Sequence, residues 1–287
     1  MRLIFRILGG FILLFLIIIS YLYFLGTIDL RTETAKNESN EELAKALLQE
    51  MGETHGIANW EKVNTYSAEF EDVFFGTLGS SSHGYAEDSV RFLLKYIPKT
   101  FDGKLKFLSG ENRGWSWGIQ SWKSYVSTAG NGNKFKKDSD ILFWLPTYQY
   151  FIEFPLRIQN ANSFAYAGEA EIDGKNCEGI IASWNTTEPQ REIDQYLIWL
   201  DKKTKRIVKL EYTIREMFNF LKGAAYFHEY KNYDGILLPS SMPVESNLLK
   251  EGFLHEMRIL DFSKNTFPEK ELRPNRALNP MGDEKLK

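Results

Sequence analysis

The hydrophobic and polar positions divide the chain into an apolar N-terminal run and a long region of short alternating segments. Arg2 and Arg6 precede an uncharged run from Ile7 to Ile28 that is rich in Ile, Leu and Phe. About 20 consecutive apolar residues can span a bilayer as a helix. The pattern therefore predicts a cytoplasmic tip and transmembrane anchor over 1–28, and the basic leader predicts that everything after Asp29 lies outside the cytoplasm.

A cleaved secretory signal peptide is the competing interpretation of this run. Such a peptide has a hydrophobic region of roughly 7–15 residues and a small-residue cleavage site. This run is longer, and no A-x-A-like site follows it, so a retained anchor is favoured. Residues 29–41 are polar and charged, which is typical of a flexible stem.

Residues 42–267 have the periodicities of one folded domain. Glu42 to Met51 has helical spacing, and Gly52 follows as a stop signal. Val63 to Phe75 alternates between apolar and polar residues, which predicts a strand with one buried and one solvated face. A Gly/Ser-rich loop, GTLGSSSHG, comes next.

Beyond this loop, one long apolar segment is followed by a series of short strands. Asp138 to Phe154 is apolar around most of its circumference and contains Pro146, so we expect a buried helix, or a helical pair, and in either case a break at the proline. Asp173-Gly174 and Asp234-Gly235 are hairpin signals. The tail over 268–287 is polar and is expected to be loose. Short segments bounded by turn residues predict strands at Lys104–Ser109, Trp115–Gln120, Trp122–Thr128, Phe164–Ile172, Cys177–Trp184, Gln195–Asp201, Arg206–Ile214, Ala224–Tyr230, Ile236–Val244 and Phe253–Phe262.

Successive strands joined by short turns pair antiparallel in a meander. A buried helical segment beside one long sheet places the domain in the α+β class. We therefore predict a curled antiparallel β-sheet, a half-barrel, that wraps helical segments and buries both apolar faces, in addition to the one N-terminal transmembrane helix.

Composition excludes several classes of protein. The 287 residues are 43% hydrophobic and 25% charged, which is ordinary for a globular domain. The net charge of −3, with both signs interspersed, gives no basic footprint for nucleic acid. Cys177 is the single cysteine, so the domain depends on its core instead of a disulfide. The unusual value is the 15% aromatic content, which suits both a core and the lining of an apolar pocket.

No catalytic or metal-binding constellation stands out. Ser80 to His83 places hydroxyl groups beside an imidazole, but a flexible loop is the favoured interpretation. The glutamates at 69, 71, 169 and 171 alternate with apolar residues, which is typical of a solvated strand face. We predict no catalytic residue, no metal site and no cofactor, because no metal-ligand spacing occurs around His55, His83, His228 or His255.

Four stretches carry a resemblance to a known family: FWLPTYQYFIEFPLRI, YAGEAEIDGKNCEGIIASW, DQYLIWLDKKTKRIVKLEYTIRE and YKNYDGILLPSSMPVE. From roughly Val63 to Phe262 the chain resembles the bacterial lipoprotein carrier and receptor superfamily, the Lol-type half-barrel, and the matching segments occur in the same order. The resemblance implies a curled antiparallel sheet around helices, with acyl chains held in its cavity. The chain differs from a diffusing carrier in its predicted tether, and from a lipidated receptor in having no cysteine near the anchor, so delivery between membranes is not implied.

The aromatic excess and the resemblance together predict non-catalytic binding of a lipid or a lipid-modified polypeptide in a hydrophobic half-barrel cavity. The domain would face the periplasm at the cytoplasmic (inner) membrane, with the membrane and an acylated ligand as partners and no nucleic acid. One alternative is a structural subunit of an envelope complex whose cavity is filled by its own helix; a hydrolase is a further alternative. The sequence does not indicate an oligomeric state. The predicted ligand-binding residues are Tyr66, Phe70, Trp115, Trp117, Trp144 and Tyr148.

Overall fold

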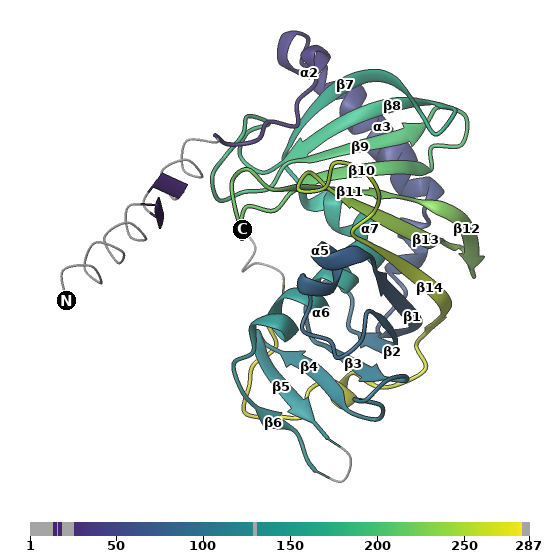
Figure 1. The fold of residues 1–287 in the computed structure, drawn as a ribbon. Helices are drawn as coiled ribbons and strands as arrows, with labels where there is room; N and C mark the ends of the chain where they lie inside the picture. Colours follow the sequence, from purple (N-terminus) through teal and green to yellow (C-terminus); the bar gives the residue numbers. More distant parts are fainter. Residues whose placement is uncertain (1–13, 16, 19–25, 129–130, 283–287) are drawn as a thin grey trace, which may run out of the picture.

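One antiparallel sheet of 14 strands runs through the computed structural model, which describes residues 14–15, 17–18, 26–128 and 131–282 (Figure 1). Its N-terminal half comprises β1 (Tyr66–Phe74), β2 (Ser89–Tyr96), β3 (Gly103–Phe107), β4 (Ser116–Gln120), β5 (Lys123–Ser127) and β6 (Lys134–Phe135). Its C-terminal half comprises β7 (Ser163–Ile172), β8 (Lys175–Ser183), β9 (Tyr196–Asp201), β10 (Ile207–Thr213), β11 (Lys222–Tyr226), β12 (His228–Tyr233), β13 (Ile236–Ser246) and β14 (His255–Lys264).

The strand order is β6-β5-β4-β3-β2-β1-β14-β13-β11-β10-β9-β8-β7, and β12 pairs with β13 beside this path. The first half meanders outward from β1, whereas the second half begins at the opposite edge with β7 and returns to the centre. There β14 pairs antiparallel with β1, from Tyr66 opposite Lys264 to Phe74 opposite His255. The predicted α+β class and curled antiparallel sheet are confirmed.

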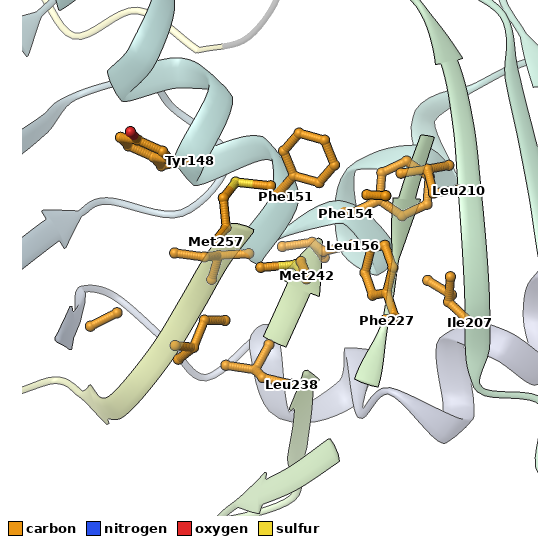
Figure 2. Packing of buried hydrophobic residues seen from close by; sticks show 14 of the residues in the cluster. Tyr148, Phe151, Phe154, Leu156, Ile207, Leu210, Phe227, Leu238, Met242 and Met257 are labelled. Carbon is orange, nitrogen blue, oxygen red and sulfur yellow. The ribbon is translucent and has the colours of Figure 1, made fainter. Parts of the chain in front are cut away.

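The helices lie on both faces of the sheet. They are α2 (Glu33–Asn37), α3 (Glu41–Thr54), α4 (Ile57–Trp60), α5 (Gly76–Ser81), α6 (Ser139–Ile152) and α7 (Phe154–Arg157), with short 3-10 turns at Ile158–Asn160 and Glu269–Glu271. The main core lies inside the curl, where side chains of α6 and α7 meet those of β10, β13 and β14 (Figure 2).

The strand predicted over Val63–Phe75 is confirmed as β1, with the expected strict alternation of buried and half-buried positions. Tyr66 and Phe70 point into the core and are fully buried. Asp72 occupies the same inward face and is also fully buried, an exception to the hydrophobic pattern. This buried carboxylate becomes important at the cavity described below.

Four local features differ from the predictions. α6 continues through Pro146 and ends only at Ile152, because burial of its apolar side chains outweighs the one backbone hydrogen bond that a proline removes. The Thr147 hydroxyl donates to the carbonyl oxygen of Phe143 at 2.7 Å inside the same turn. The strand predicted over Ala224–Tyr230 divides into β11 and β12, β2 was not predicted, and α5 begins the stretch predicted as a Gly/Ser loop.

The segments predicted as a flexible stem (29–41) and a loose tail (268–287) both contribute buried contacts. Leu30 and Ala35 are buried in a second cluster on the outer face of β7 to β10. Near the other end, Leu272 is fully buried and the Arg273 guanidinium binds Asp102 at 2.7 Å. The average polarity of a segment therefore does not show whether its few apolar or charged side chains make contacts in the fold. Domain boundaries drawn from composition remain predictions.

Most of the predicted anchor over 1–28 lies outside the described residues. In the part of the chain that the structure describes, no helix has the length and hydrophobicity needed to cross a membrane.

Candidate functional site

A cavity of about 580 Å³ lies between α6 and the inner face of the C-terminal half of the sheet. Its volume falls within the range of about 300–1,000 Å³ that is typical of small-molecule sites. The lining is mostly aromatic and aliphatic, with contributions from α5 and α6, from β9, β10, β11, β13 and β14, and from loops. The main apolar lining residues are Phe101, Trp122, Leu142, Phe143, Trp144, Pro146, Tyr150, Phe151, Tyr196, Leu210, Tyr212, Ile214, Met217, Leu221, Val244, Leu248 and Leu254.

The all-round hydrophobicity of α6 is explained by its two buried faces. Residues three and four apart lie on one face of a helix, and Phe143, Thr147 and Tyr150 follow this spacing on the cavity side. The opposite face carries Ile141, Leu145, Tyr148 and Ile152, all fully buried against the core. One face of α6 therefore packs into the core, and the other face forms a wall of the cavity.

Tyrosine rings form a large part of the cavity wall. The rings of Tyr150 and Tyr196 stack with centroids 5.7 Å apart, and Phe151 meets Tyr212 edge-on at 5.4 Å. Burial raises the pKa of Tyr212, and raises that of Tyr196 well above its usual range. These hydroxyls therefore stay neutral and supply hydrogen bonds without charge.

One polar group on the wall is an oriented imidazole. His255 Nδ1 lies 2.8 Å from Asp72 Oδ1, and Tyr148 donates to Asp72 Oδ2 at 2.9 Å. Phe74 stacks on the imidazole at 5.1 Å, and Trp144 meets it edge-on at 5.7 Å. Because the carboxylate only accepts hydrogen bonds, Nδ1 carries a proton. Nε2 has no hydrogen-bond partner among the described residues, so it is the ring nitrogen available to a ligand.

A second polar group, Asp194, is already satisfied by the protein. Its Oδ1 accepts from the Thr213 hydroxyl and from the Arg215 backbone N–H, each at 2.8 Å. Burial raises the pKa of Asp194, and these hydrogen bonds oppose the shift. The carboxylate fixes the end of β10 and is not positioned as an isolated acid.

The mouth of the cavity carries exposed apolar side chains. Met217, on the loop between β10 and β11, is 49% exposed, and Leu248, on the loop between β13 and β14, is 53% exposed. Both also line the cavity. The two loops are joined through Asn247, which accepts from the Lys222 backbone N–H at 3.0 Å and donates to the Phe220 carbonyl at 2.8 Å.

The six residues predicted from the sequence lie in three different places. Trp144 lines the cavity. Trp115 is on the surface, 40% exposed, just before β4. Tyr66, Phe70 and Tyr148 are buried in the main core, and Trp117 is half-buried and packs against it; none of these four is among the cavity-lining residues. Whether any of the six binds a ligand remains a prediction.

The residues selected from the sequence did not include Tyr150, Tyr196, Tyr212 or Met217, which line the cavity. For Tyr150 a signal was available, since the spacing Phe143-Thr147-Tyr150 marks a second apolar face of the helix. For Tyr196 and Tyr212 no local signal distinguishes a ring on a cavity wall from a ring in the core.

The sequence matches no family model and no curated protein. Solved structures do match in fold. A DUF1329 family protein from Desulfovibrio piger has a TM-score of 0.52 at 12% identity, covering 83% of this chain and 98% of that one. A LolA superfamily protein from Nitrosomonas europaea has a TM-score of 0.52 at 13% identity, with coverages of 80% and 96%. A putative outer membrane lipoprotein-sorting protein domain from Vibrio parahaemolyticus has a TM-score of 0.50 at 15% identity, with coverages of 81% and 98%. The chain is therefore similar in fold, over nearly the whole length of each, to structures of the LolA, lipoprotein-sorting and DUF1329 groups.

Proposed function

We propose that this domain binds the apolar chain of a lipid or of a lipid-modified polypeptide in the cavity between α6 and the sheet. The observation that carries the proposal is an apolar, aromatic-lined space of about 580 Å³ with exposed apolar side chains at its mouth. Removing about 14 methylene groups from water contributes about 11 kcal/mol before the costs of binding, at about 0.8 kcal/mol each. The similarity in fold to a lipoprotein-sorting domain and to a LolA superfamily protein supports the same proposal.

The binding is proposed to be non-catalytic. Shielding an acyl chain requires no proton transfer, and the carboxylates of the cavity residue Asp194 and of Asp72 behind His255 are committed to protein donors. Asp194 accepts from Thr213 and Arg215, and Asp72 is bound by His255 and Tyr148. The Nε2 of His255, opposite the protonated Nδ1, can accept one hydrogen bond from the polar end of a ligand.

Co-purification and fluorescence quenching test this function. Native mass spectrometry of the full chain, extracted in mild detergent, should detect a bound lipid. Trp122 and Trp144 line the cavity, so a brominated fatty acid should quench part of the tryptophan fluorescence saturably. Absence of any co-purifying lipid together with linear, non-saturable quenching would refute the proposal.

A cavity-filling substitution supplies a matched comparison. Thr147 is half-buried on the cavity side of α6, so Thr147→Phe places a ring in the ligand space and should abolish the saturable quenching. Thr54→Phe makes the same change on α3, which contributes no residue to this cavity in the described part of the chain, and should bind as the parent does. Equal affinities in the two variants would place the ligand elsewhere.

The alternative function is that of a structural subunit with a self-filled cradle. It is favoured by the inner face of α6, since Ile141, Leu145, Tyr148 and Ile152 close the part of the curl beside the N-terminal strands. A lipid-free mass in several detergents, together with a Thr147→Phe variant that is about 1–3 kcal/mol less stable than the parent because the added ring finds no free space, would support this alternative.

We also propose that the domain faces the periplasm from an uncleaved anchor in the inner membrane, on the basis of the apolar run and its basic leader. A reporter fused after Lys287 should be active only outside the cytoplasm. The mature chain should keep residues 1–26, and a processed N-terminus just after Gly26 would replace the anchor with a secreted domain.

A further inference from the structure

Three exposed apolar side chains cluster at one end of the curled sheet. Met217, Phe218 and Leu248 are 49%, 51% and 53% exposed, and they lie on the two loops that Asn247 joins. A single exposed hydrophobic residue is ordinary, but a contiguous apolar group on neighbouring loops marks an interaction surface. We call the loops over 214–221 and 247–254 the rim.

The rim is also bonded to the end of the N-terminal apolar run. The backbone N–H of Ile28 donates to the carbonyl of Asn219 at 3.0 Å. The Arg215 guanidinium, which is largely buried, donates to the carbonyls of both Ile28 and Asn219. Phe218 is the chain neighbour of Asn219, and consecutive Cα atoms are about 3.8 Å apart. The rim is therefore held within a few ångströms of the residue at which the predicted transmembrane run ends.

This attachment differs from a flexible tether. Beyond Ile28, Leu30 is buried and its backbone N–H donates to Gln195 at 3.1 Å, while Thr32 donates to the Ala167 carbonyl at 2.7 Å. The chain thus has no free stem between the apolar run and the sheet in the region from 28 to 37. A membrane that holds the run also lies against the rim.

The charges on the two loops and their flanking strand ends are balanced. Residues 214–222 and 245–254 contain three cations and three anions: Arg215, Lys222 and Lys250, and Glu216, Glu245 and Glu251. Attraction to anionic headgroups therefore adds little, and contact with a bilayer depends on the apolar side chains.

We infer that the rim is a membrane-docking surface on which Met217, Phe218 and Leu248 enter the headgroup region of the bilayer that carries the anchor. Met217 and Leu248 also line the cavity, so docking turns the mouth of the cavity toward the lipid. A membrane lipid or an acyl chain then passes between the bilayer and the cavity without crossing water. Docking itself depends on the rim and the anchor; the passage of a ligand rests on the proposed lipid-binding function.

Site-directed fluorescence on the full chain in phosphatidylcholine vesicles tests the docking. The parent chain serves as the unlabelled control, because its single cysteine, Cys177, is fully buried and should not react with the dye. An environment-sensitive dye attached in Phe218→Cys or Leu248→Cys should be blue-shifted and strongly quenched by lipid that carries a nitroxide near the headgroup. The matched control is Phe135→Cys, on the edge strand β6 and 36% exposed, where the dye should report water and remain unquenched.

Quenching at the rim should not change when ionic strength is raised, because the contact is apolar. Rim dyes that are no more quenched than the dye at 135 would overturn the inference, as would quenching that salt abolishes. A blue shift without quenching would mean that a second copy of the chain covers the rim, and would overturn it as well. Lipid binding is measured separately in detergent, so a chain that binds lipid there but leaves its rim in water would retain the proposed function and lose this inference.

Discussion

The joint between α6 and α7 contains a buried ion pair whose disruption has a predictable cost. Glu153 is fully buried, and its carboxylate accepts from Tyr66 at 2.9 Å and Gln149 at 2.7 Å. Arg157 Nε lies 3.0 Å from the same carboxylate, and the guanidinium rests 4.1 Å from the ring centroid of Phe101, a cavity-lining residue. The pair thus joins the core to one wall of the cavity.

Arg157→Ala should lower the free energy of unfolding by about 3–5 kcal/mol, the usual cost of removing one partner of a buried pair. The remaining carboxylate would keep its hydrogen bonds from Tyr66 and Gln149 but lose its countercharge. Glu153→Gln combined with Arg157→Met removes both charges and keeps most of the volume, so this double variant should recover most of the loss.

The dependence on pH gives an independent signature. Burial raises the pKa of Glu153, and Arg157 opposes that rise. In Arg157→Ala the opposition is removed, so the pKa of the folded state rises further above that of the unfolded state. The destabilisation should therefore be full above the folded pKa and should shrink as pH falls through it, because the folded chain takes up a proton.

Urea unfolding of the parent, single and double variants, followed by tryptophan fluorescence across a range of pH, measures all three expectations. A loss below about 1 kcal/mol in the single variant would show that water reaches Glu153. A double variant as unstable as the single one would show that packing of Arg157 on Phe101, rather than charge, dominates.

Urea unfolding also tests three other expectations. Phe70→Ala should lower the free energy of unfolding by about 3–5 kcal/mol, because the fully buried ring packs with its centroid 4.9 Å from that of Tyr148. Glu69→Ala should change it by no more than about 0.5 kcal/mol. Equal losses in the two variants would mean that the faces of β1 are misassigned. Burial lowers the pKa of His55 to about 4, so stability should fall by up to about 3 kcal/mol as pH drops from about 6.5 through 4. This fall should be absent in His55→Asn. Gly56→Ala should cost at least about 1–3 kcal/mol, since φ is +78° and a Cβ would lie 1.9 Å from a backbone oxygen; a neutral result would show that this loop can shift.

Local features of the fold could be predicted because their causes are local. Alternation over Val63–Phe75 predicted β1 and its buried face. The Asp-Gly pairs at 173–174 and 234–235 predicted hairpin turns, because Asp and Gly adopt positive φ at little cost. All four residues have positive φ in the structure. Strand pairing between chain neighbours follows from such short connections.

The aromatic character of the candidate site could be predicted from the sequence, but most of its residues could not. An excess of aromatic residues indicated more rings than strands alone require, and Trp144 does line the cavity. Yet Phe70 and Tyr148 from the same set are fully buried, whereas Tyr196 and Tyr212, which were not selected, line the cavity. A core ring and a cavity ring have the same chemistry and the same strand spacing, so periodicity cannot separate them.

By itself, the sequence determined the class of the domain, the alternating faces of its strands, the hairpin turns and the presence of one helix that is apolar around most of its circumference. The tertiary structure alone decided that β14 pairs with β1 across 180 or more residues of chain, that Asp72 meets His255, and that the loop carrying Met217 lies beside Ile28. Helix and strand periodicity depend on neighbours a few residues apart, whereas a cavity is space that distant segments enclose and leave unfilled. That space depends on how the whole sheet curls around α6, and no local pattern in the sequence specifies it.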